Sequence, residues 1–248
     1  MKDKRLYLYG AHSVKDLLEM HPGIITRLYL RGTLEKHTLD SFRDLAKSAK
    51  VAVSVVSEKD IKRYVGDVND QGAVALVSGF PYADFDEWIE TVDMEKNPAV
   101  VIMDSLEDPH NVGAVIRTAM GLGASAVVIP SSRQVSVTQT VFKVAAGAAN
   151  HIPIIQAGSL TKVMNRLKKK GFWIGALSKS DKRADSLLSH EFTSPTVFVV
   201  GSEGSGVRPS VISDSDYIVS IPIRKEIESY NASVSLAIAL YEWKRQNS

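Results

Sequence analysis

An isolated cation lies in an otherwise uncharged segment of the chain. Over residues 109–132, PHNVGAVIRTAMGLGASAVVIPSS, the one formally charged side chain is Arg117. A helix that is apolar on all sides is expected to be buried, and a buried guanidinium needs partners. Two interpretations of Arg117 are therefore open. It is a structural residue whose guanidinium binds backbone carbonyls or an acidic side chain, or it is a cation that serves a reaction site. Asn111, near the start of the same segment, has the simpler interpretation of a helix N-cap.

A second isolated charge follows an apolar strand in a glycine-rich turn. Glu203 is the only charge in TVFVVGSEGSGV, and it lies among Gly201, Gly204 and Gly206. Glycine lets the backbone approach a ligand closely, and open α/β sheets bind ligands at the carboxyl ends of their strands. A plain turn with a solvated acid is the alternative, but three glycines in six positions favour a binding loop.

Three hydrogen-bonding side chains precede the last helical segment. Ser229, Asn231 and Ser233 follow the strand-like run YIVSIPI. One of them would suffice as a helix cap, so the excess indicates an additional binding role.

Other familiar motifs do not fit the context that they require. Gly121, Gly123 and Ala126 have the spacing of a dinucleotide fingerprint, but they follow a helical segment and precede a strand, the reverse of the order that binds pyrophosphate. The six histidines include no HExxH pair, so we expect no metal site. The run Lys168–Lys170 ends a helical segment and is interpreted as a solvated helix end.

These residues need a scaffold, and the apolar runs predict two α/β domains. Over residues 1–80, alternating short strands and amphipathic helices predict a small α/β domain. The expected strands there are 5–10, 25–30, 51–56 and 72–80, and the expected helices are 13–20 and 38–50, each beside a Ser or Thr that can cap it. Over residues 98–248, near-continuous apolar runs predict strands covered on both faces, and therefore a mostly parallel sheet. The expected strands are 99–103, 126–129, 152–155, 172–177, 196–200 and 217–223, and the expected helices are 111–122, 138–148, 159–170, 209–213 and 231–246.

An acidic stretch separates the two domains. Residues 1–80 carry 13 Lys+Arg against 10 Asp+Glu (+3), residues 81–97 carry one against six (−5), and residues 98–248 carry 16 against 12 (+4). Apolar side chains recur at helical intervals in 81–97, which predicts a short docked helix rather than a free linker. The predicted domains are therefore 1–80 and 98–248, joined by the acidic helix 81–97.

Composition excludes several classes of protein. The chain has 248 residues, 44% hydrophobic and 23% charged, which is typical of a globular protein and excludes general disorder. It has no cysteine, which excludes disulfides, thiolate metal sites and cysteine nucleophiles. No apolar run approaches the ~18 residues of a membrane span, so a cytoplasmic protein is expected. The basic domains permit a polyanionic partner without establishing one.

Three segments together resemble a known family. LEDPHNVGAVIRTA, VVGSEGSGVR and SIPI followed by ESYNASVSLAIALYE resemble, in order and spacing, the three motifs of the SpoU/TrmH branch of the SPOUT RNA methyltransferases. The resemblance is greatest to the RlmB-type enzymes, which methylate a guanosine ribose of large-subunit ribosomal RNA. LYGAHSV resembles the opening of their ribosomal-protein-like RNA-binding domain. The resemblance implies S-adenosylmethionine as methyl donor, a 2′-hydroxyl of RNA as acceptor, a homodimer with its site near the interface, and a deep trefoil knot in the C-terminal domain.

The resemblance also implies roles for individual residues. The catalytic motifs match Asn111, Arg117, Glu203, Ser229 and Asn231, and the cofactor contacts match Gly201, Ile221 and Tyr230, largely through the backbone. A guanidinium has a pKa above ~12, so Arg117 is expected to stabilise charge developing on the attacking oxygen. It could act as a base only if dry surroundings and a phosphate relay lowered its pKa. Asn111 and Glu203 are expected to orient Arg117 and the ribose, while Ser229 and Asn231 shape the cofactor turn and hold substrate.

The sequence departs from the family pattern at several positions. Tyr230 stands where the family usually has Leu, Asn150 where it usually has Glu, and RKEIES replaces a Gly-Ser-rich lead. These departures bear on substrate contacts and the RNA target more than on the reaction. In the first domain, Arg27, Arg31 and Lys36 are candidates for phosphate contacts, with solvated surface as the alternative.

Three other functions stay open on the sequence. A transfer RNA ribose 2′-O-methyltransferase would carry the same motifs, and a non-catalytic RNA-binding ribosome-assembly protein would keep the fold. A nucleotide-dependent small-molecule enzyme is the third, and the misplaced glycine fingerprint weighs against it.

Overall fold

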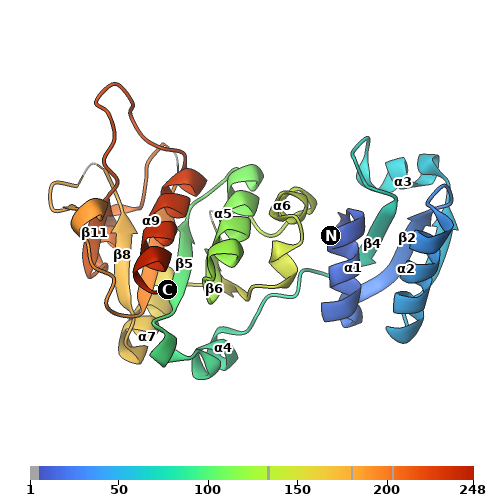
Figure 1. Ribbon diagram of the computed structural model, residues 1–248, viewed down its shortest axis with the longest axis horizontal. Coiled ribbons are helices and arrows are strands. Elements are labelled where there is room, and N and C mark those ends of the chain that lie inside the picture. Colours follow the sequence, from blue (N-terminus) through green and yellow to red (C-terminus); the bar gives the residue numbers. More distant parts are fainter. Residues whose placement is uncertain (1–5, 133–134, 180, 203) are drawn as a thin grey trace. The chain divides into compact units, whose positions relative to one another are not determined.

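The computed structural model describes residues 6–132, 135–179, 181–202 and 204–248. The chain divides into two compact units (Figure 1). The first comprises Met1–Pro81 with Val137–Asn150, and the second comprises Tyr82–Ser136 with His151–Ser248. The segment Val137–Asn150 therefore clusters with the first unit, a grouping that the predicted boundaries do not include.

The first unit is built on a four-stranded mixed sheet. Its strands are β1 (Leu6–Tyr9), β2 (Ile25–Arg31), β3 (Val53–Val56) and β4 (Ala73–Val77), in the order β1-β4-β2-β3. β4 pairs antiparallel with β1 and β2, and β3 pairs parallel with β2. Because side chains alternate between the faces of a strand, Leu8, Leu28 and Leu30 share one fully buried face. The expected small α/β domain is confirmed.

Three helices belong to this sheet, and one of them was not predicted. They are α1 (Ala11–Met20), α2 (Lys36–Ser48) and α3 (Glu58–Val65), with the short 3₁₀ turn η1 (Pro22–Ile24) after α1. The predicted Ser or Thr caps of the first two are wrong, because Gly10 and Glu35 occupy the N-cap positions and provide no side-chain bond. α3 begins with a capping box between Ser57 and Asp60, a signal that the sequence displays directly.

The segment Val137–Asn150 is held to the first unit by specific contacts. It forms α6 (Gln139–Ala145) and η3 (Ala148–Asn150). The Lys143 ammonium lies 5.4 Å from the centre of the Tyr9 ring, and the buried Asn150 amide donates to the carbonyl of Ser13 at 3.0 Å. A ring nitrogen of His21 lies 3.3 Å from the Asn150 carbonyl oxygen.

The second unit is a seven-stranded sheet in the order β7-β6-β5-β10-β8-β11-β9, and each of its strand pairings is parallel. The strands are β5 (Ala99–Asp104), β6 (Ala126–Pro130), β7 (Ile154–Ala157), β8 (Trp173–Leu177), β9 (Asp185–Ser186), β10 (Thr196–Gly201) and β11 (Tyr217–Ser220). β5, β6 and β10 are buried along their whole length. The predicted mostly parallel sheet is confirmed.

Helices cover both faces of this sheet. They are α4 (Phe85–Thr91), α5 (Pro109–Leu122), α7 (Leu160–Lys170), α8 (Pro209–Ser213) and α9 (Ala232–Gln246), with the short turns η2 (Met94–Lys96) and η4 (Leu187–Ser189). α4 and α7 share one hydrophobic cluster with β5, β6 and β10, while α5 and α9 pack side by side (Figure 1). α4 is the short helix expected in 81–97, and it buries Trp88 and Ile89.

The trefoil knot stays a prediction. Within the described part of the chain, none of the helices has the length and apolar character needed to cross a bilayer.

Candidate functional site

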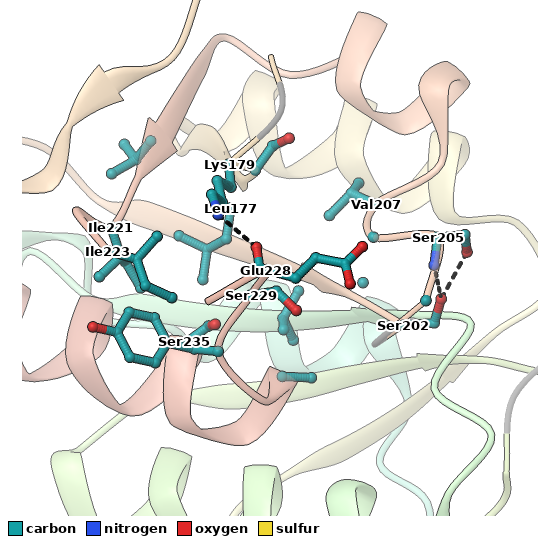
Figure 2. A pocket seen from close by; sticks show the side chains of 18 of the residues that line it. Leu177, Lys179, Ser202, Ser205, Val207, Ile221, Ile223, Glu228, Ser229 and Ser235 are labelled. Carbon is teal, nitrogen blue, oxygen red and sulfur yellow. Dashed lines mark hydrogen bonds between the residues drawn. The ribbon is translucent and has the colours of Figure 1, made fainter. Parts of the chain in front are cut away.

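The carboxyl ends of four parallel strands meet at one edge of the seven-stranded sheet. Gly201 at the end of β10 lies opposite Asp104 at the end of β5, and β8 and β11 end beside them. The loops that follow β8, β10 and β11 enclose a cavity of about 340 Å³ (Figure 2). That volume lies within the roughly 300–1,000 Å³ typical of small-molecule sites, and this edge is where open α/β sheets bind ligands.

Residues from two of the three predicted motifs line this cavity. Gly201, Ile221 and Tyr230, the three candidates for cofactor contacts, all lie in its wall, together with Ser229 from the catalytic set. They come from the ends of β10 and β11 and from the segment before α9, which are distant in sequence. The motif spacing groups these residues in sequence, and the fold places them in the wall of one cavity.

Gly201 allows two backbone segments to approach closely. A Cβ atom built on Gly201 would lie 2.0 Å from the carbonyl carbon of Gly206. Ser202 and Gly206 exchange backbone hydrogen bonds of 3.2 and 2.9 Å, and Gly206 has a φ of 67°. The Ser202 hydroxyl also bonds the Ser205 hydroxyl at 2.7 Å (Figure 2). The glycine-rich loop is thus a folded-back turn whose backbone borders the cavity.

A half-buried ion pair anchors the far end of this loop. The Asp104 carboxylate is fully buried and accepts bonds from the Arg208 Nε at 2.6 Å and the Arg208 backbone N–H at 2.9 Å. A buried carboxylate needs such partners. The pair fixes the loop between β10 and α8 to the end of β5.

Sequence reasoning missed Lys179, which lines the cavity from the loop after β8. Its ammonium donates to the carbonyl oxygen of Ile227 at 2.9 Å. It also donates to the carbonyl oxygen of Glu228 at 2.7 Å (Figure 2). These bonds hold the segment that carries Ser229 and Tyr230 against β8. The available signal was its position, a lysine two residues after an apolar strand.

Asn111 and Asn231 lie beside the cavity and contact each other. The Asn231 Nδ2 donates to the Asn111 Oδ1 at 2.8 Å, which joins the start of α9 to the first turn of α5. Asn231 also caps α9 by accepting from Ser233 N at 2.9 Å, as predicted. The N-cap role predicted for Asn111 is wrong, because Asp108 occupies that position and accepts from His110 N.

Arg117 lies elsewhere on α5. Six residues after Asn111 correspond to about 9 Å along the helix and about 120° around it. Asn111 is buried, whereas Arg117 is exposed and forms no ion pair within the described residues. The expectation of a helix buried on all sides is therefore wrong: α5 buries one face and presents Arg117 and Met120 to solvent. Glu203, the proposed partner carboxylate, lies outside the described residues.

Arg117 is adjacent in sequence to Thr118, which lines an apolar groove of about 500 Å³. The other lining residues are Leu187, Leu188, Ser233, Val234, Ala237, Ile238, Tyr241 and Glu242. Several of them are unusually exposed for apolar side chains, with Leu188 at 82% and Tyr241 at 61%. Exposed apolar patches of this kind mark interaction surfaces.

The candidates for phosphate contacts in the first unit separate into two groups. The Arg31 guanidinium pairs with the buried Asp70 carboxylate at 2.6 Å, so Arg31 is structural. Arg27 and Lys36 are exposed, and Arg27 donates to the Ser54 hydroxyl at 3.0 Å.

Family models match both halves of the sequence. The model described as the SpoU rRNA methylase family matches residues 98–241. The model described as RNA 2′-O ribose methyltransferase substrate binding matches residues 7–83.

Similar proteins and solved structures agree with these matches. A Staphylococcus haemolyticus protein named for the TrmH family of tRNA/rRNA methyltransferases is 33% identical over 97% of this chain and 96% of its own length. A Staphylococcus epidermidis protein of the same name is 34% identical over the same shares. The SpoU methyltransferase AviRb from Streptomyces viridochromogenes superposes with a TM-score of 0.81 at 23% identity, over 98% of this chain and 90% of that one. An AdoMet-bound rRNA methyltransferase from Sinorhizobium meliloti gives 0.83 at 20% identity, over 98% and 87%.

These structures share the fold of this chain. The two family matches, and relatives about one-third identical over nearly the whole length, show membership of a family and not only a shared fold. The chain belongs to the SpoU/TrmH family of RNA methyltransferases.

Proposed function

We propose that this protein transfers a methyl group from S-adenosylmethionine to a ribose 2′-hydroxyl of RNA, and that the target is a guanosine of large-subunit ribosomal RNA, as in the RlmB-type enzymes. The observation that carries the proposal is the glycine-cradled cavity at the carboxyl edge of the sheet, lined by Gly201, Ile221 and Tyr230. Ribosomal RNA as substrate agrees with the cytoplasmic location expected from the sequence.

The cavity suits an S-adenosylmethionine molecule. Its wall alternates apolar side chains, such as Ile221 and Ile223, with serine hydroxyls and backbone, which matches a ligand with an adenine ring and a polar amino-acid end. Any side chain at Gly201 would collide with the Gly206 backbone, so the loop is shaped for close approach. When bound, the cofactor supplies a methyl group on a positively charged sulfur, open to attack by an oxygen.

The protein's contribution is to position and to stabilise charge. Holding two reactants in the right geometry can supply roughly 7–11 kcal/mol of a barrier. The pair Asn111 and Asn231 fixes the turn that contributes Ser229 and Tyr230 to the cavity, so both asparagines are positioning residues. Arg117, as a permanent cation, would stabilise the negative charge that develops on the attacking oxygen.

A second copy of the chain would complete the site. Arg117 is exposed and does not line the cavity of its own chain, and the apolar groove beside it is uncovered. We place the homodimer interface on this groove, where pairing would remove apolar surface from water. It would also surround Arg117 with protein, in a site of lower dielectric where its charge has more effect.

The test is methyl transfer from radiolabelled S-adenosylmethionine to total RNA, followed by nuclease mapping of the labelled nucleotide. We expect label in large-subunit ribosomal RNA, and Arg117→Ala should abolish turnover while cofactor affinity stays near normal. Arg166→Ala, an exposed arginine on α7, is the matched control and should stay active. Near-normal methylation by Arg117→Ala would contradict the assigned role.

A transfer RNA target is the second candidate, because the relatives named above carry both RNA classes in their names. Label confined to transfer RNA would favour it. Absence of label in any RNA, with intact RNA binding, would instead favour a non-catalytic RNA-binding protein.

A further inference from the structure

One face of the first unit's sheet packs against α3. Tyr9 and Val74 on that face pack against Ile61 and Val65 of α3 in a closed hydrophobic cluster. Tyr29 is aligned with Val74 and Tyr9 in the sheet register, and Tyr7 lies two residues before Tyr9 on β1. Both tyrosines are half-buried on this face, so α3 leaves part of each ring accessible.

Three tyrosine rings gather on this face. Tyr64 of α3 stacks on Tyr7 with ring centres 5.2 Å apart and an interplanar angle of 13°. Its ring centre also lies 4.5 Å from that of Tyr29, and Tyr7 and Tyr29 are 6.5 Å apart. We call Tyr7, Tyr29 and Tyr64 the tyrosine platform. Each ring is half-buried, so part of its aromatic surface faces solvent.

A cation lies directly beside the platform. Arg27 precedes Tyr29 by two residues on β2 and so projects from the same face. It donates to the hydroxyl of Ser54, which is the register partner of Tyr29 on β3. Unlike Arg31, which is neutralised by Asp70, Arg27 is exposed and forms no ion pair within the described residues.

This combination of groups fits one class of ligand. Unpaired RNA bases stack on aromatic side chains, and an adjacent arginine binds the phosphate that follows the base. Paired bases in a duplex are already stacked and cannot use such a surface.

We propose that the tyrosine platform and Arg27 bind an unpaired nucleotide of the RNA substrate, by stacking its base on the tyrosines and pairing its phosphate with Arg27. The proposal rests on the proposed function, and it assigns the contact to residues within the segment matched by the substrate-binding family model. It also predicts that the substrate presents a loop or bulge rather than a continuous duplex.

The test measures equilibrium binding of the full chain to a fluorescein-labelled hairpin RNA with an unpaired loop, and to a blunt duplex of similar length. Tyr29→Leu and Tyr64→Leu keep apolar bulk but remove the ring, so affinity for the looped RNA should fall about fivefold or more. Tyr29→Phe and Tyr64→Phe keep the ring and should bind almost as the parent. Duplex affinity should change little in all four variants.

Arg27→Gln tests the phosphate contact separately. It should weaken binding to the looped RNA and reduce the slope of log affinity against log salt by about one. Arg43→Gln, an exposed arginine of α2, is the matched control and should leave both quantities unchanged. Because Arg27 is exposed, this variant remains informative even if a leucine variant fails to fold.

The outcomes separate the platform from the proposed function. Folded leucine variants and Arg27→Gln that bind looped RNA as the parent does would overturn the platform, whatever the result of the methylation assay. A parent protein whose looped-RNA binding depends on these residues, but which transfers no methyl group to any RNA, would support the platform and contradict the proposed function.

Discussion

Gly201 offers the sharpest test of the cavity at the residue scale. A methyl group in Gly201→Ala would meet the Gly206 carbonyl carbon at 2.0 Å and the Val207 nitrogen at 2.2 Å. These are backbone atoms, so the loop must move. We expect S-adenosylmethionine affinity, measured by titration calorimetry, to fall at least about tenfold, or ~1.4 kcal/mol. Gly158→Ala, where nothing lies within 4 Å of the new atom, should bind normally. Equal affinities in the two variants would contradict the claim that the close backbone approach at Gly201 shapes the cofactor cavity.

Asn150 has a structural role that the sequence comparison did not suggest. Its departure from the family's usual Glu was interpreted as a matter of RNA target, but its side chain is buried and donates to Ser13. Asn150→Asp replaces that donor with a carboxylate, which leaves the Ser13 carbonyl unpaired. We expect a loss of about 1–3 kcal/mol in the stability of the first unit.

The two units allow this loss to be located. All three tryptophans, Trp88, Trp173 and Trp243, lie in the second unit, so tryptophan fluorescence reports that unit. Amide hydrogen exchange of α1 reports the first. Asn150→Asp should accelerate exchange in α1 and leave the fluorescence midpoint in urea unchanged. Unaltered exchange in α1 would mean that the Asn150 bond contributes little.

At the scale of elements, the strands were easier to predict than the helix ends. β5, β6 and β10 are buried on both faces, and continuous apolar runs such as AVVIM mark that condition directly. Helix starts depend on local geometry that composition does not fix, which is why Gly10 and Glu35 replaced the predicted caps. α3 was missed although its capping box is visible in the sequence, because the apolar periodicity of only 8 residues is short.

Local composition also misled the prediction that α5 is buried on all sides. Its lack of charge suggested burial on all sides, yet a helix also stays uncharged when its outer face lies beside an apolar groove. Thr118 lines that groove, and the neighbouring Met120 is 40% exposed. The sequence therefore singled out Asn111 and Arg117 as candidates on one helix, but the side of the helix on which each lies required the structure.

His190 makes the packing near β11 sensitive to pH. Its ring stacks on Tyr217 with centres 4.4 Å apart and meets the edge of Phe192 at 4.7 Å. Burial lowers the pKa of His190 below 6.5, with Asp185 acting in the opposite direction. Between the two pKa values the unfolded chain binds more protons than the folded one, so stability falls as pH falls through about 6.5.

His190→Phe removes the titrating group and keeps an aromatic ring. We expect the parent to lose more stability than this variant when the pH is lowered from about 7.5 to about 5.5, as measured by urea unfolding with tryptophan fluorescence. His12→Phe, at an exposed histidine of the first unit, is the control and should follow the parent. Parallel losses in the parent and His190→Phe would show that the histidine does not titrate in this range.

At the scale of the whole molecule, the cavity and the substrate-binding family match fall in different units. The second unit has the cavity, and the first has the segment matched by the substrate-binding family model. The chain passes between the units at residues 81–82, 136–137 and 150–151, so they are connected at three points of the chain. The last two crossings could not be predicted from the sequence, because Val137–Asn150 has ordinary helical periodicity and its partners are distant in the chain.

The proposed homodimer can be tested on the groove between α5, η4 and α9. Leu188→Lys and Tyr241→Lys place charges on two of its most exposed apolar side chains, and an interface would have to desolvate them. We expect sedimentation velocity to show a dimer for the parent and a monomer for the double variant. Methyl transfer should be lost with the dimer, because Arg117 would lack the protein surroundings that the partner supplies.

Met20→Lys, at an apolar residue of α1 that is 46% exposed, is the matched control and should remain dimeric. A parent that sediments as a monomer yet transfers methyl groups would place the whole reaction within one chain, and Arg117 would then have to reach the substrate from the exposed face of α5.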